Sequence, residues 1–79
     1  MDKLIDIANR AVADYGFRQA VLYGAGDIAS KWALSEEESV LLMGQVLVEL
    51  KALPIPVQPD DIPAQQARVA EVIKGLFAS

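Results

Sequence analysis

The chain has 79 residues with no cysteine and no histidine, and its 11 acidic and 7 basic residues give a net charge of −4. These counts exclude disulfides, thiolate chemistry and the common zinc sites, and the net charge offers no attraction to phosphate backbones. A hydrophobic fraction of 53% argues against disorder, so we expect one folded domain over residues 1–79.

The chain carries no sign of a targeting segment or a membrane span. Charged side chains at Asp2, Lys3, Asp6 and Arg10 interrupt the N-terminal apolar residues, which is not the pattern of a signal peptide. No apolar run approaches the roughly eighteen residues that a span requires. We therefore expect a cytoplasmic protein with no membrane association.

The first fourteen residues carry apolar side chains at the i, i+3, i+4, i+7 spacing of an amphipathic helix. This spacing predicts a helix over 2–14 that Gly16 ends, followed by a shorter helix over 17–23. No segment alternates apolar and polar residues with period two. The sequence therefore predicts an all-α fold.

Two glycines, Gly24 and Gly26, should break the chain after the second helix. Asp27 is then placed to cap a third helix that runs to about Ala33. We expect Trp32 in this helix to anchor the core, although a partly exposed tryptophan would suit a binding surface.

Residues 35–53 form the most apolar predicted helix. Ser35 and Glu38 have the spacing of a capping box, and negative charge at Glu36 and Glu37 suits a helix N-terminus. Capping therefore explains the three glutamates without a functional acidic patch. Gly44 inside this helix is unfavourable by roughly 1 kcal/mol relative to alanine, and either a closely packed neighbour or a local kink would account for it.

Proline residues separate this helix from the last one. Pro54 must end it, and the segment 54–63 then predicts an extended, polyproline-like connector whose Ile55 and Val57 are free to dock on the bundle. Asp60 or Asp61 should cap the last helix. The predicted fold is thus a small four- or five-helix bundle with a Pro-rich connector before the last helix.

The helical spacing also separates a core from a candidate contact surface. The central helix is apolar around most of its circumference, so either the other helices wrap it completely or a second polypeptide covers part of it. We expect the core to contain Trp32, Leu42, Val46, Leu50, Val69, Val72, Ile73 and Leu76. We expect a protein-interaction surface on the opposite side, formed by Leu41, Val48 and Leu53 with Ile55 and Val57 beside them.

Little in the sequence indicates catalysis. The acids lie mostly at helix starts, and Ser30, Ser35 and Ser39 have no recognisable base. The glycine-rich segment 23–26 lacks a preceding strand and a phosphate-binding lysine, so it is more simply a turn. No alternating acids and glycine mark a calcium loop. We expect neither enzymatic activity nor a cofactor or metal.

Residues 27–38 resemble a helix-turn-helix, with Ala29 as the small residue of the first helix and Ala33 where the turn usually holds glycine. Its second helix begins with three glutamates and continues as an apolar run, whereas a major-groove helix needs Arg, Lys, Asn or Gln. More narrowly, the segment 32–44 and Arg68 resemble the helical half of Xre-type antitoxins of the MbcA/ParS group. That resemblance implies dimerisation and toxin binding, but the toxin-contacting C-terminal portion would be missing.

These observations favour a small non-catalytic regulatory or adaptor protein, such as an inhibitor, an antitoxin-like protein or an accessory factor. Its partner would be another protein, itself as a homodimer, or both. The alternative is a helix-turn-helix DNA-binding regulator with a basic edge formed by Arg10, Arg18 and Lys31. Nucleic acid is the less favoured partner because the chain is acidic.

Overall fold

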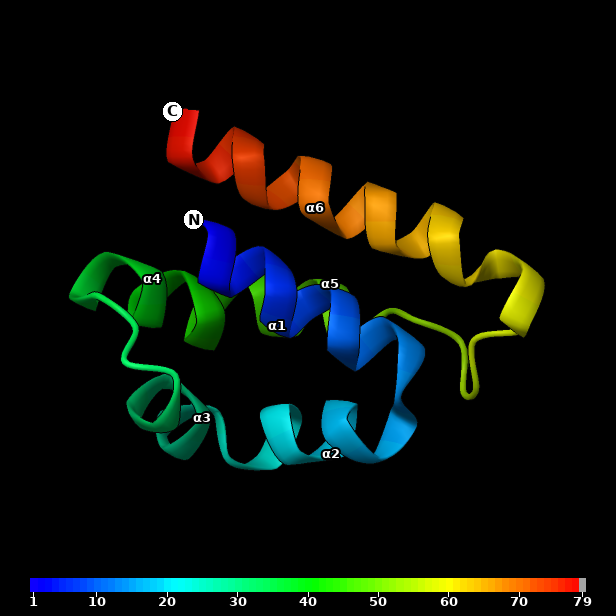
Figure 1. Ribbon diagram of the computed structural model, residues 1–79, viewed down its shortest axis with the longest axis horizontal. Helices are drawn as coiled ribbons and strands as arrows, with labels where there is room; N and C mark the ends of the chain where they lie inside the picture. Colours follow the sequence, from blue (N-terminus) through cyan, green and yellow to red (C-terminus); the bar gives the residue numbers. More distant parts are fainter. Residues whose placement is uncertain (79) are drawn as a thin grey trace.

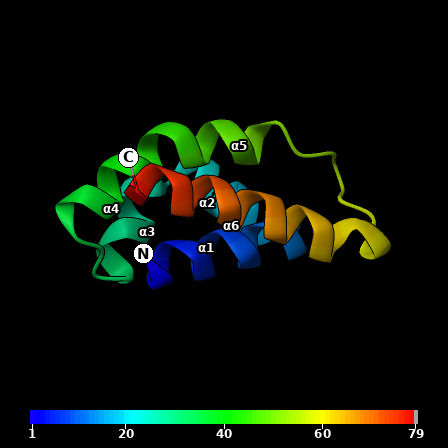
Figure 2. The same cartoon turned by 90° about the horizontal axis from the view of Figure 1, so that it is seen from above.

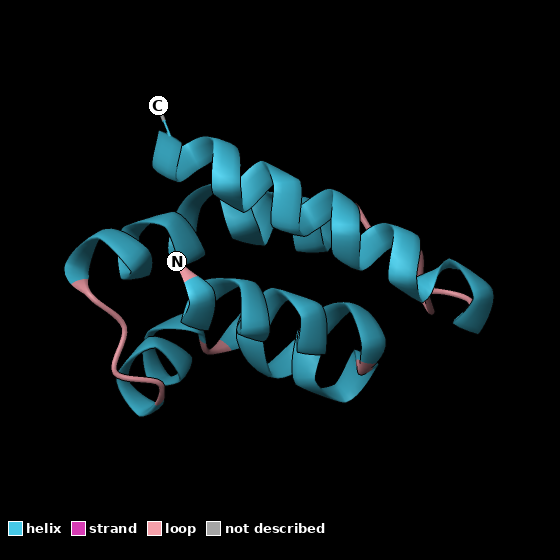
Figure 3. Ribbon diagram, turned by 45° about the horizontal axis from the view of Figure 1, so that its top comes forward, coloured by secondary structure: helices cyan, strands magenta, loops and turns pink. Residues whose placement is uncertain are grey.

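The computed structural model describes residues 1–78, and short loops join the helices that make up most of this span (Figures 1 and 3). No strand occurs among the described residues. The predicted all-α fold with a proline-containing connector before the last helix is confirmed.

Helices α1 (Asp2–Ala13) and α2 (Tyr15–Tyr23) form an antiparallel pair joined at Asp14. Asp14 ends α1 and caps α2, since its carboxylate accepts a hydrogen bond from the Phe17 N–H at 3.0 Å. Gly16 was expected to end the first helix, but it lies inside α2. The capping carboxylate of Asp14 is the stronger local signal because it satisfies a free N–H of the next helix.

Helix α3 (Ala25–Lys31) begins three residues earlier than predicted, so Asp27 lies in its first turn and is not its cap. A Cβ atom at Gly24 would lie 3.1 Å from the Ala20 carbonyl oxygen, which explains the glycine between α2 and α3. After α3 the chain turns through Ala33, whose φ of 53° lies in the left-handed region. The turn delivers Ser35 to the start of the next helix.

The central helix is a continuous rod of three segments: α4 (Glu36–Leu41), the π-helical turn η1 (Leu42–Val46) and α5 (Leu47–Lys51). We call residues 36–51 the rod. The predicted capping box is confirmed, with both Ser35–Glu38 hydrogen bonds present. Gly44 lies within η1, and among residues 1–78 no atom other than those of its chain neighbours and the nearby backbone of its own helix lies within 4 Å of a Cβ built on it. A closely packed neighbour therefore does not explain Gly44 within this chain.

The connector leads from the rod to the single turn η2 (Pro59–Asp61) and helix α6 (Ile62–Ala78). Seen from above, α1 and the rod run along opposite long edges of the molecule, with α6 between them nearest the viewer and α2 on the far side (Figure 2). Helix α6 packs mainly on α1. The described residues thus form five helices, with the rod counted as one helix, and the single turn η2.

The core lies between these helices, and five of the eight predicted core residues are fully buried: Leu42, Val46, Leu50, Val69 and Ile73. Trp32, Val72 and Leu76 are only half-buried. Trp32 caps the C-terminal end of α3, and the centre of its ring lies 6.4 Å from that of Phe17 in α2. Helix α1 supplies a buried stripe that completes the interior: Leu4, Ile7, Ala8, Ala11 and Val12.

One cation is buried within this bundle. Arg18 is 2% exposed, and its guanidinium donates to the carbonyl oxygens of Ala11 at 3.1 Å, Val12 at 3.3 Å and Pro54 at 3.0 Å. The first two carbonyls belong to the last turn of α1, where the helix leaves its acceptors unpaired and carries partial negative charge. Arg18 therefore joins the end of α1 to the connector.

Candidate outer face of the central rod

The buried residues of the rod follow a spacing of four: Glu38, Leu42, Val46 and Leu50. In an uninterrupted α-helix each step of four residues turns the side chain about 40° too far, so Leu50 would point roughly 120° away from Glu38. The π turn η1 is wider than an α turn and takes up this excess. All four side chains therefore face the interior.

The same spacing of four places a second line of residues on the opposite side. Glu36, Val40, Gly44, Val48 and Ala52 are all exposed, and we call this line the outer face. Val40 is 64% and Val48 58% exposed, and Met43 beside them is 51% exposed. Two aligned valines are thus open to solvent along one edge of the molecule.

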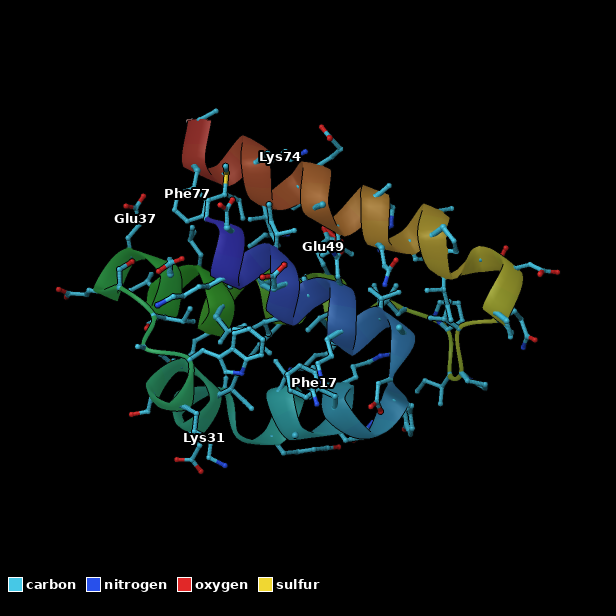
Figure 4. All side chains as sticks on the ribbon, in the orientation of Figure 1. Phe17, Lys31, Glu37, Glu49, Lys74 and Phe77 are labelled. Atoms are coloured by element: carbon cyan, nitrogen blue, oxygen red, sulfur yellow. The ribbon has the colours of Figure 1, made fainter. Side chains whose placement is uncertain are left out.

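A shallow hollow of about 590 Å³ lies at the N-terminal end of the outer face, lined by Ser35, Glu36, Glu37, Val40 and Leu41. Its floor is apolar and its rim carries two carboxylates. Glu37 extends from α4 toward the side of the rod on which the end of α6 and Phe77 lie (Figure 4). The hollow thus has the chemistry to accept an apolar side chain next to a cation.

The start of the rod is held by a hydrogen-bonded carboxylate. Glu38 accepts from the Ser35 backbone N–H at 2.9 Å and pairs with the α-ammonium of Met1 at 2.9 Å. The backbone hydrogen bond from Ser35, followed by that from the ammonium group, keeps the pKa of Glu38 below its ordinary value of 4.5. This capping role occupies Glu38, while Glu36 and Glu37 remain free to face solvent.

The C-terminal end of the rod carries the opposite charge. Lys51 is exposed and lines a second hollow, of about 210 Å³, together with α2 side chains that include Gln19 and Tyr23. Ile55 lines the same hollow and is 70% exposed, and Tyr23 is 87% exposed. This end therefore combines a cation with apolar side chains.

The five predicted contact residues differ in their exposure to solvent. Val48 and Ile55 are exposed, as a contact surface requires. Leu41 is half-buried and lines the hollow that Glu36 and Glu37 border. Leu53 and Val57 are only 4% and 6% exposed, so their assignment to that surface is wrong. Both pack into the core, since Arg18 holds the start of the connector through the Pro54 carbonyl oxygen and the π turn changes which face the end of the rod presents.

Val40 and Met43 were not among the predicted contact residues, yet they belong to the exposed surface. Ideal α-helical spacing cannot identify them, since it ignores the shift at η1. The sequence did contain one signal for this surface: the apolar residues of the central helix recur every four residues. Gly44, near the middle of the rod, was a second signal for the exposed surface, because an exposed glycine lowers helix propensity without helping to pack the core.

The basic edge suggested for DNA binding is not assembled. Arg18 is buried, while Lys31 and Arg10 are exposed, and the guanidinium of Arg10 lies 4.5 Å from the centre of the Phe17 ring. Within residues 1–78, no helix is long and apolar enough to cross a bilayer, and no three His, Cys, Asp or Glu side chains gather as metal ligands would. Neither finding adds a further candidate site.

Comparisons were made with protein-family models, with curated proteins and with solved structures. None of the three finds a match to this chain. The resemblance of residues 27–77 to Xre-type antitoxins therefore stays a prediction from sequence. The outer face must be interpreted from its own chemistry.

Proposed function

We propose that this chain is a small non-catalytic regulatory or adaptor protein of the cytoplasm that acts by holding another polypeptide on its outer face. The observation that carries the proposal is the alignment of exposed Val40 and Val48 along one side of the rod. Single exposed apolar residues are ordinary. Apolar residues lined up on one helix face, with charged groups at both ends, are typical of a helix-binding surface.

The polar groups beside the outer face support binding rather than reaction chemistry. The Ser35 hydroxyl accepts the Glu38 N–H at 3.1 Å, and Glu38 completes the cap. Glu36 and Glu37 are exposed carboxylates on the rim of an open hollow. A general acid or base needs a group held against a reacting atom, whereas solvated carboxylates suit electrostatic recognition.

The DNA-binding alternative has less support. The turn at Ala33 does join two helices, but the second of these presents Glu36 and Glu37 to solvent. These carboxylates would face phosphate or base edges if α4 entered a groove, and they would repel the backbone. A binding measurement with mixed duplex DNA at low salt tests this alternative, and we expect no retention.

Affinity capture from cells that naturally produce the chain tests the proposal. The substitution Val48→Asp places a charge within the outer face, and Ala67→Asp places the same charge on an exposed position of α6. We expect the unmodified chain and Ala67→Asp to retain a defined protein, either a different one or a second copy of this chain. Val48→Asp should not retain it. Equal retention by all three would show that the outer face is not the binding surface.

A further inference from the structure

We infer that the hollow between α2, the end of the rod and the connector binds a small carboxylic acid with an apolar body. We call it the cationic hollow, and its lining includes Tyr15, Arg18, Gln19, Leu22, Lys51 and Ile55. The inference goes beyond the proposed function, because no residue of the outer face lines this hollow. It follows from the sign of the charges there, from the buried cation in its wall, and from its size.

The charges around the cationic hollow have one sign. Two of the chain's seven basic residues, Arg18 and Lys51, line it, whereas none of the eleven acidic residues does. This is the reverse of the chain as a whole, whose net charge is −4. Lys51 is exposed and makes no ion pair within residues 1–78. Its ammonium group is therefore available to an anion.

The charge of Arg18 is only partly balanced inside the protein. Its guanidinium is buried and donates to three carbonyl oxygens, but it forms no ion pair with a carboxylate of residues 1–78. The end of α1 supplies a partial charge of about −0.5. A buried cation without a full counter-charge is unfavourable, so an anion held in the cationic hollow would stabilise it.

Arg18 also has donors to spare. A guanidinium carries five N–H groups, and the hydrogen bonds to Ala11, Val12 and Pro54 use one N–H on each of its three nitrogens. One N–H on Nη1 and one on Nη2 therefore have no acceptor within residues 1–78. A carboxylate suits such a group because it can accept from two N–H donors at once.

The size and the walls of the cationic hollow define the rest of the ligand. Its volume is about 210 Å³, whereas a cavity of about 150 Å³ is enough to bind benzene. Leu22 and Ile55 supply apolar surface, and the ring of Tyr15 lies 5.4 Å from the guanidinium carbon of Arg18. One aromatic ring or a short acyl chain therefore fits beside the carboxylate. Inorganic phosphate would leave the apolar surface uncovered, so it gains nothing from its burial.

Titration of the ¹⁵N-labelled chain with phenylacetate, followed by nuclear magnetic resonance at neutral pH, tests the inference. We expect shifts in the backbone signals of α2 and of residues 50–53 and in the Nε–H signal of Arg18, with a dissociation constant on the order of 1 mM. Phenylacetamide has the same shape but no charge. It should bind at least about tenfold more weakly, because the charge-assisted hydrogen bonds are lost.

Matched variants locate the binding site. Lys51→Gln removes the exposed cation of the cationic hollow and should weaken phenylacetate binding about fivefold, whereas Lys31→Gln removes an exposed cation elsewhere and should change nothing. Gln19→Glu places a carboxylate of the same shape in the wall, and its repulsion should weaken binding further. None of these three side chains makes a hydrogen bond or ion pair within residues 1–78, so the variants should keep the helicity of the unmodified chain in circular dichroism.

Three results would overturn the inference: no shift well above millimolar phenylacetate, equal affinity for phenylacetate and phenylacetamide, or equal binding by Lys51→Gln and Lys31→Gln. Inorganic phosphate serves as a further control. If it bound more tightly than phenylacetate, the apolar part would contribute nothing and the assignment to carboxylic acids would be wrong. Val48→Asp should bind phenylacetate as the unmodified chain does, so failure here and failure of the proposed function are separate results.

Discussion

Replacing Arg18 with methionine tests whether a buried cation holds the end of α1 to the connector. Methionine keeps much of the apolar stem but removes three hydrogen bonds, to Ala11, Val12 and Pro54, of 3.0–3.3 Å. Two of the carbonyls that lose a donor belong to the last turn of α1, where no backbone N–H replaces it.

The expected effect is large. Hydrogen bonds from a charged group each contribute about 1.5–3 kcal/mol, and the methionine stem recovers part of the loss by packing. We expect the free energy of unfolding to fall by about 3–4 kcal/mol, a large share of the roughly 5–15 kcal/mol typical of small domains. Arg18→Lys should lose about half as much, because a compact ammonium cannot reach all three carbonyls as a planar guanidinium does.

Urea unfolding followed by the fluorescence of Trp32, the single tryptophan, and by far-ultraviolet circular dichroism measures both variants. A matched control is Arg10→Met, since Arg10 is exposed and should change stability by less than about 1 kcal/mol. If Arg18→Met were as mild as Arg10→Met, the hydrogen bonds of Arg18 would not hold the fold together.

Three further predictions concern other parts of the bundle. The pKa of Glu38 in the folded chain lies below its ordinary value of 4.5, so its carboxylate stabilises the fold above that pH. This contribution should disappear as the pH falls through the folded pKa. Glu38→Gln should flatten that part of the curve of unfolding free energy against pH. The buried Oδ1 atom of Asn9 has no hydrogen-bond partner within residues 1–78, so Asn9→Leu should stabilise the chain by about 1 kcal/mol and raise the melting temperature in calorimetry by about 4–8 °C. A lower melting temperature would show that the amide is needed. Gly44→Ala should raise the stability of the chain by up to about 1 kcal/mol in urea unfolding, because the added Cβ meets open space. A loss of stability would show that the π turn needs the glycine.

Local chemistry made much of the fold predictable. The helical spacing of Leu4, Ile7 and Ala11 identifies α1, and the Ser35–Glu38 capping box fixes the start of the rod. The prolines after Leu53 end the rod and define the connector. Each of these signals depends on neighbours within a few residues, so the sequence alone contains it.

The errors at Leu53 and Val57 came from a departure from regular α-helical geometry and from an interaction between distant segments. Leu53 and Val57 were placed on the surface because the spacing was that of a straight α-helix and the connector was expected to be extended. The π turn at residues 42–46 rotates the end of the rod, and the hydrogen bond from Arg18 to the Pro54 carbonyl holds the connector against the bundle. Sequence spacing does not show either effect.

The candidate site was only partly predictable for the same reason. Val48 and Ile55 were correctly expected to be exposed, whereas Val40 and Met43 become a continuous surface with Val48 only once the π turn is known.

Sedimentation equilibrium over micromolar to millimolar concentrations, with circular dichroism of the same samples, tests most directly whether the outer face is a contact surface. The unmodified chain and Ala67→Asp should shift from monomer to dimer as concentration rises, while Val48→Asp should remain monomeric with unchanged helicity, because Val48 is 58% exposed in the single chain. If Val48→Asp instead lost its helicity, Val48 would belong to the folded core. If all three chains gave the same masses throughout, the outer face would not bind a second copy.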